Sequence, residues 1–176
     1  MHGHGHGHGL YRKLAIGALL TSGLVAATAD GPALAATATG SFNVTITITS
    51  QCTVSNATNM AFPSSGLLSA AVNQTNTFNV TCTNTTPYTI GLNNGLNVSG
   101  AQRRMLGGVT NTEFVSYNLY SDAGRTIAWG NLSGSWVSGA GTGSATAYTV
   151  YGQVPAQATP SPSANYTDTV TITVTY

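Results

Sequence analysis

The sequence predicts an all-β sandwich, and three observations lead to this prediction. The stretch "GSFNVTITITSQC", residues 40–52, alternates apolar and polar side chains without a break, which is the period of a half-buried β-strand. The last stretch, "YTDTVTITVTY", has the same alternation. Between the two, short runs rich in Val and Thr are separated by Asn-Gly, Ser-Gly and Gly-Gly turns, and no segment has the period of an amphipathic helix.

The first 35 residues have the features of a secretory leader. A basic tripeptide at residues 11–13 precedes an apolar run at 14–29, and Ala33 and Ala35 stand in A-x-A spacing. We predict a signal peptide cleaved between Ala35 and Ala36, and therefore export. A transmembrane helix is the weaker interpretation, because the run is short for a bilayer span and contains Gly, Ser and Thr.

Four histidines alternate with glycine in "HGHGHGHG", residues 2–9. Such a segment could chelate a divalent metal, but it would leave with the leader. We interpret it as an expression tag or an unusual start of the leader, and we set it aside. We predict no metal site and no cofactor in the remaining chain.

The first strand after the leader carries a strongly apolar face. Phe42, Val44, Ile46 and Ile48 alternate with Asn and Thr. We expect residues 36–49 to form a separate N-terminal strand and residues 50–176 to form the sandwich. The expected strands are 41–49, 52–56, 76–83, 87–92, 114–120, 126–129, 144–152 and 166–176.

The last strand places a second apolar row on one face. Tyr166, Val170, Ile172, Val174 and Tyr176 share a parity that is opposite to that of the intervening threonines. A strand with one apolar face needs a sheet to join. The first strand could join its own domain or that of a neighbour, and periodicity alone does not choose between these two arrangements.

Two cysteines, Cys52 and Cys82, are present in the whole sequence. In an exported chain an even count favours a disulfide, and we predict this pair. Closing a loop of this length would constrain the unfolded chain by roughly 3.5–4 kcal/mol in the entropy model. A zinc site is disfavoured, because no histidine follows the leader.

Charged side chains are scarce after the leader, with three Arg against Glu113, Asp122 and Asp168. Nucleic acid is therefore a poor partner, since binding phosphates needs many cations. Catalysis by histidine is excluded. A carboxylate pair such as Glu113 with Asp122 is conceivable for a hydrolase, but each carboxylate is better interpreted as a lone surface or turn residue, and we predict that the chain is not an enzyme.

Several segments resemble the spore coat protein U domain, the pilin fold of archaic chaperone–usher pili. "CTV" at 52–54 follows the first strand, and "FNVTCTNTTPYTIGLNNG" at 78–95 resembles the strand with the second cysteine and the strand after it. "RRML" at 103–106 precedes "VSYNLYSDAGRTIAWG", and "YTVYGQVPAQ" and "NYTDTVTITVTY" close the domain. The segment after "CTV" departs from the family pattern and its loop is not placed.

The resemblance implies an incomplete immunoglobulin-like sandwich that lacks its seventh strand and is completed by donor-strand exchange. Phe42, Val44, Ile46 and Ile48 would then be the donor side chains, and Val170, Ile172, Val174 and Tyr176 would line the acceptor groove. The implied partners are a periplasmic chaperone, an outer-membrane usher and further subunits of the same or a related kind. The implied location is a pilus at the cell surface.

The leading hypothesis is a structural pilus subunit for surface adhesion and biofilm formation. The alternative is a secreted carbohydrate- or surface-binding adhesin module, with Trp129, Trp136, Tyr117 and Tyr120 as the aromatic candidates. We favour packing or subunit contact for these four aromatics.

Overall fold

The computed structural model describes residues 35–163 and 165–176, so nearly all of the expected leader lies outside the described residues. The chain separates into two units, Met1–Val44 and Thr45–Tyr176, and all the strands belong to the second. Within the described residues all regular structure is β-strand, which confirms the predicted class. The strands are β1 (Cys52–Ser55), β2 (Val72–Cys82), β3 (Pro87–Leu92), β4 (Arg103–Gly107), β5 (Glu113–Tyr120), β6 (Val137–Ala140), β7 (Ala145–Val154) and β8 (Ile172–Thr175).

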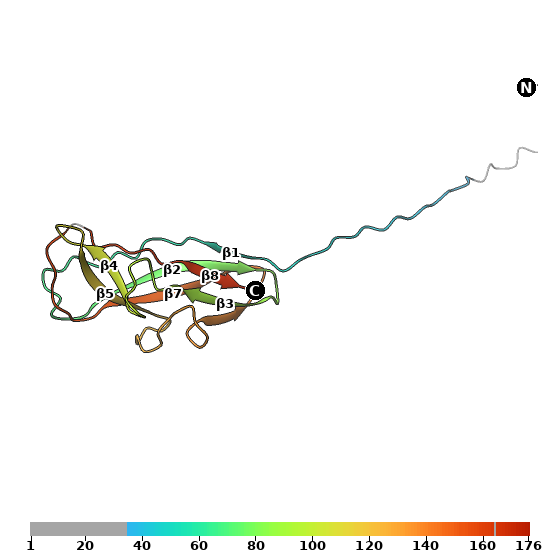
Figure 1. Cartoon of the computed structure of the whole chain (residues 1–176). Coiled ribbons are helices and arrows are strands. Elements are labelled where there is room, and N and C mark those ends of the chain that lie inside the picture. Colours follow the sequence, from blue (N-terminus) through green and yellow to red (C-terminus); the bar gives the residue numbers. More distant parts are fainter. Residues whose placement is uncertain (1–34, 164) are drawn as a thin grey trace, which may run out of the picture. The chain divides into compact units, whose positions relative to one another are not determined.

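The strands form two antiparallel sheets (Figure 1). The larger sheet has the order β1-β2-β7-β5-β4, and the smaller has the order β6-β3-β8. The longest pairing joins β2 to β7, with Val72 opposite Val154 and Thr81 opposite Ala145. In the smaller sheet β8 pairs with β3 over four residues, with Ile90 opposite Val174. The chain therefore ends on an edge strand of the smaller sheet.

The core lies between the two sheets and follows the period of two. β2 supplies Phe78 and Val80, β3 supplies Ile90 and Leu92, and their polar neighbours face outward. Trp129 is 1% exposed and donates its indole N–H to the Ile90 carbonyl at 2.8 Å. The aromatic ring therefore fills the centre without leaving its polar atom unpaired.

Several predicted elements agree with the structure. The 87–92 strand has the predicted bounds, and the strands at 52–56, 76–83, 114–120 and 144–152 correspond to β1, β2, β5 and β7 with shifted ends. The predicted disulfide joins Cys52 to Cys82 with an S–S distance of 2.04 Å. It links β1 to β2 at a pair of residues that are directly opposite in the sheet.

Other predicted elements are wrong. Residues 41–49 form no strand, because within the described residues no sheet edge pairs with them. The expected strand at 126–129 is a single bridge between Ala128 and Tyr120. The last strand covers only Ile172–Thr175, with an isolated bridge between Thr167 and Leu106 before it.

Two strands were not predicted at all. β4 begins with two arginines, and β6 contains a glycine, so neither has the apolar alternation of a half-buried strand. None of the described residues forms a helix that is long and apolar enough to cross a membrane.

Candidate functional site

A groove of about 570 Å³ opens onto the core of the sandwich. Its floor consists of core side chains from four strands: Phe78 of β2, Leu92 of β3, Tyr117 and Leu119 of β5, and Val150 of β7. Core side chains of an ordinary sandwich are covered by neighbouring strands. Here part of the core faces an open groove instead.

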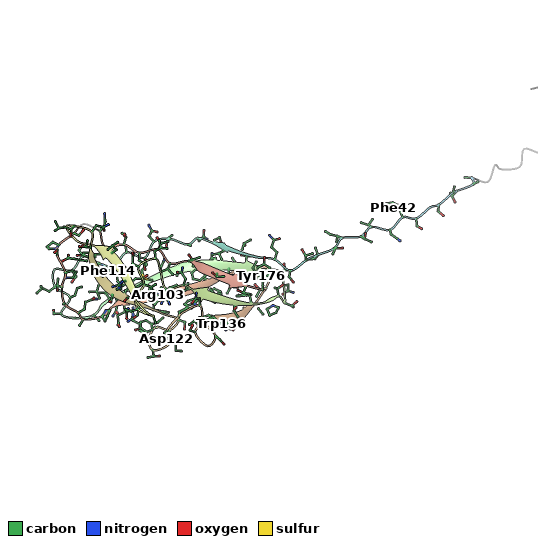
Figure 2. All side chains as sticks on the ribbon, in the orientation of Figure 1. Phe42, Arg103, Phe114, Asp122, Trp136 and Tyr176 are labelled. Carbon is green, nitrogen blue, oxygen red and sulfur yellow. A yellow bond between two sulfur atoms is a disulfide. The ribbon has the colours of Figure 1, made fainter. Side chains whose placement is uncertain are left out.

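One side of the groove is the last stretch of chain. Tyr166, Asp168, Val170, Ile172 and Val174 are half-buried, and the residues between them are exposed, so these five form a single inward row, here called the C-terminal row. Four of the five, Tyr166 through Ile172, line the groove, and Val174 packs against the core beyond it. Tyr176 is 57% exposed at the end of the chain (Figure 2).

Asp168 belongs to the C-terminal row but was missing from the predicted apolar face. Its position follows from the same period of two that places Val170 and Ile172, so the parity of the strand could have found it. One carboxylate oxygen accepts hydrogen bonds from the Leu96 amide at 2.8 Å and from Asn97. The other oxygen accepts the Tyr117 hydroxyl at 2.7 Å.

The turn at 93–97 closes over Asp168. Gly95 has a φ of +79°, and a Cβ there would lie 1.8 Å from the Asp168 carboxylate. Glycine is therefore required both for the backbone conformation and for the close approach. Burial, together with the hydrogen bond to Asp168, raises the pKa of Tyr117, so this hydroxyl keeps its proton at physiological pH.

Arg103, labelled in Figure 2, lies near Tyr117 and Asp168 and is 7% exposed. Its guanidinium donates to the carbonyl oxygens of Leu92, Asn93 and Trp129 at 2.8–2.9 Å. Burial lowers the pKa of Arg103 from its usual value, though a guanidinium still stays charged. The polar end of the groove is thus a fixed hydrogen-bonded structure.

The N-terminal arm, residues 36–48, is the second part of the candidate site. It forms no strand, and its four large apolar side chains are exposed: 86% for Phe42, 85% for Val44, 84% for Ile46 and 70% for Ile48. Phe42 is labelled in Figure 2. Four exposed apolar side chains of one parity are unusual unless a partner covers them.

The arm is followed by residues 49–51, which are hydrogen-bonded to Thr83. The Thr83 hydroxyl accepts the Gln51 amide at 3.1 Å and donates to the Thr49 carbonyl at 3.2 Å, and the Thr83 amide donates to the Gln51 carbonyl. Residues from 49 onward are thus anchored to the end of β2, next to the disulfide.

The carboxylates predicted to be lone residues each accept hydrogen bonds from other residues of the domain. Asp122 accepts the amides of Thr126 and Ile127 in the turn after β5, and Glu113 accepts the amide and hydroxyl of Ser161. The described residues hold no cluster of three or more His, Cys, Asp or Glu side chains that could bind a metal. Among the aromatic candidates, Trp129 and Tyr117 are buried in the core, whereas Trp136 is 42% exposed.

The Spore Coat Protein U domain model matches residues 38–173. The chain belongs to the Spore Coat Protein U domain family. This is a family of structural domains and not of enzymes. Protein U of Myxococcus xanthus is 31% identical to this family member over 162 residues, covering 84% of this chain and 90% of that protein.

Two solved structures resemble this Spore Coat Protein U domain. One is the CsuC–CsuE chaperone–tip adhesion subunit pre-assembly complex from archaic chaperone–usher Csu pili of Acinetobacter baumannii, with a TM-score of 0.54 and 24% identity. The match covers 74% of this chain but only 40% of the other, and it supports the fold alone. The other is a chaperone–tip adhesin complex of CFA/I fimbriae, with a TM-score of 0.42 and 14% identity. This match covers 70% of this chain and 41% of the other.

Proposed function

We propose that this chain is a structural subunit of an archaic chaperone–usher pilus. In this proposal the N-terminal arm of one copy inserts as a strand into the groove of the next copy and pairs with the free edge of β8. This is β-strand addition, in which main-chain hydrogen bonds supply affinity and alternate side chains supply register. The resulting fibre serves surface adhesion and biofilm formation.

The observation behind the proposal is the match between the groove and the arm. The groove is lined beside an edge strand by partly exposed apolar side chains such as Val170 and Ile172, and the arm offers Phe42, Val44, Ile46 and Ile48 on one face. Burying four such side chains contributes roughly 6–12 kcal/mol as an upper figure. Thirteen extended residues reach about 43 Å, which is enough to cross a domain.

The anchoring of residues 49–51 favours a neighbour's groove over the chain's own. Thr49 and Gln51 are hydrogen-bonded to Thr83, and Cys52 is fixed to Cys82 by the disulfide. With these residues fixed, only residues 36–48 would be free to bend toward the groove of the same copy. Insertion into a second copy leaves all these bonds in place.

Before assembly the open groove is a hazard, because a free strand edge beside partly exposed apolar side chains promotes aggregation. A periplasmic chaperone that covers the groove until an outer-membrane usher exchanges it for the next subunit would remove this hazard. The fold likeness to a chain of a chaperone–subunit complex supports such a partner. The expected leader supports export through the periplasm to the cell surface.

Deletion of residues 36–48 tests the proposal. The truncated chain should still be recovered with its chaperone, but no fibres should be found by electron microscopy of sheared surface material. A full-length control with Thr45→Ser and Thr47→Ser changes only the other face of the arm and should assemble normally. Fibres of normal length and yield from the deletion would contradict the proposal.

A second candidate function, an adhesin module, is motivated by Trp136, which directly precedes β6 and is 42% exposed. Aromatic rings at a surface can stack on sugars. A glycan array with the purified chain would test this function: selective binding that is lost in Trp136→Ala would favour it. Equal, unselective signals from the natural chain and from Trp136→Ala would contradict the adhesin function.

A further inference from the structure

The segment 57–62, which follows β1, lies against the inner face of the larger sheet. It contains no strand, and side-chain amides hold it in place: Gln74 donates to the Ala61 carbonyl at 2.7 Å, and Asn76 bonds both the carbonyl and the hydroxyl of Thr58. Gln74 and Asn76 have the same parity as Phe78 and Val80, so they are the polar continuation of the core row of β2. The segment therefore covers the sheet where the apolar row of β2 ends.

Met60 and Phe62 project from this segment over β7. A Cβ at Gly152 would lie 2.3 Å from the Met60 sulfur and 2.9 Å from the Phe62 ring. A glycine weakens the interior of a strand, and it often marks a position where another group must approach the backbone closely. Gly152 is buried near the C-terminal end of β7, and Met60 and Phe62 are the side chains that approach it.

Both side chains also line the groove. Met60 and Phe62 share it with Val170 and Ile172 of the C-terminal row, and all four pack against the core while remaining partly exposed. Ile172 of the C-terminal row lies in β8 of the smaller sheet, whereas Met60 and Phe62 approach Gly152 of β7 in the larger sheet. A strand lying in this groove would contact both.

We infer that Met60 and Phe62 form a second apolar wall of the groove, that the inserted arm of another copy packs against this wall, and that Gly152 sets its depth. This inference rests on the proposed function. An unbranched thioether adapts its shape to irregular neighbours, so Met60 can follow arm side chains of different size. The alternation of Met60, Ala61 and Phe62 is the sequence signal for this wall.

The test uses the full chain with Ile46→Asp, so that its own arm is a poor donor, and a synthetic peptide of residues 36–49. Ile46 is 84% exposed, so the substitution leaves the acceptor intact. Into this background we introduce Met60→Ala, Gly152→Ala and, as a matched control, Gly66→Ala, because a Cβ at Gly66 meets no atom within 4 Å. Peptide affinity is measured by calorimetry.

Met60→Ala removes apolar contact area, and Gly152→Ala pushes both side chains of the wall out of place. Each should weaken peptide binding by about tenfold or more, and Gly66→Ala should leave it within about twofold. A second measurement uses the background chain without substitutions at Met60 or Gly152. Bound peptide should slow the oxidation of Met60 by hydrogen peroxide, and mass spectrometry measures the extent of this oxidation.

The outcomes separate the two proposals. If the peptide binds the background chain but Met60→Ala and Gly152→Ala bind equally well and Met60 oxidation is unchanged, the second wall is wrong and donor-strand insertion stands. If the peptide does not bind the background chain or the chain with its natural Ile46, the proposed function fails and this inference fails with it.

Discussion

Arg103 shows at the scale of one residue how the open groove keeps its shape. Its guanidinium joins the end of β3, through Leu92 and Asn93, to the buried segment at Trp129. Without this donor the buried carbonyls of Leu92 and Trp129 would each lose a hydrogen bond, and an unpaired buried group costs about 1–3 kcal/mol. The planar fork of an arginine can reach three carbonyls at once, which the single ammonium of a lysine does not reproduce.

We therefore expect Arg103→Lys to destabilise the domain by about 2–3 kcal/mol, measured by urea unfolding. Arg104→Lys is the matched control, because Arg104 is only half-buried and its Nε donates to the Asn97 carbonyl alone. That control should cost less than about 1 kcal/mol, including loss of stacking on Phe114. Equal losses at both positions would show that the buried network adds nothing.

Glu113 makes the stability of the domain depend on pH. The hydroxyl and amide of Ser161 donate to its carboxylate and lower the pKa of Glu113. A carboxyl whose pKa is lower in the folded state stabilises the fold above its unfolded pKa, and this contribution disappears as pH falls through the folded pKa. Glu113→Gln should thus lower the melting temperature at pH 7. At acid pH the melting temperatures of the variant and the unsubstituted chain should become similar.

Thermal unfolding between about pH 2.5 and 7 checks this expectation, with the two melting curves converging on the acid side. Asp122→Asn is a useful comparison, because Asp122 also has a lowered pKa but binds the turn at Thr126 and Ile127. Curves for Glu113→Gln that stay parallel to those of the unsubstituted chain at every pH would contradict the role of this carboxylate.

At the scale of elements, the sequence predicts those strands whose pattern comes from burial in this chain. Residues 87–92 and 114–120 alternate because their inner side chains enter the core, and β3 and β5 lie there. β4 was missed because its buried inner residue is Arg103, whose burial depends on carbonyls brought near by the fold. The 41–49 segment has the clearest alternation and yet forms no strand, since alternation alone forms no strand without a sheet edge to pair with, and none of the described segments pairs with it.

The same reasoning applies to the site. The apolar row of the last strand could be predicted from parity, whereas its bound carboxylate at Asp168 and the wall at Met60 depend on contacts with distant segments. Gly95 and Gly152 look like ordinary turn and strand glycines in the sequence. Only the approach of Asp168 to one, and of Met60 to the other, shows why they are glycines.

The arm should bind through one face only. A peptide of residues 36–49 with Ile46→Thr and Ile48→Thr loses about 1.5 kcal/mol of apolar burial at each position, and we expect it to bind the groove about 100-fold more weakly. A control peptide with Thr45→Ser and Thr47→Ser alters the face of opposite parity and should bind as the natural peptide does. Calorimetry compares the three peptides, and equal losses on both faces would rule out a fixed register.

For the whole molecule, the scarcity of charge determines which force can assemble it. The described residues carry three arginines and three carboxylates. Arg103, Glu113, Asp122 and Asp168 are all hydrogen-bonded within the domain, and Arg104 stacks 3.9 Å above the Phe114 ring. Three positive and three negative side chains give little net attraction or repulsion between copies, so the proposed association would depend on apolar burial and main-chain hydrogen bonds.

We therefore expect binding of the arm peptide to change by less than about twofold between 0.05 and 1 M sodium chloride, although the screening length falls several-fold over this range. Sodium sulfate, which strengthens apolar association, should tighten binding instead. The heat capacity change on binding should be negative, as for burial of apolar surface. Calorimetry at several temperatures and salt concentrations measures all three, and a tenfold loss of affinity in sodium chloride would show that charge steers assembly after all.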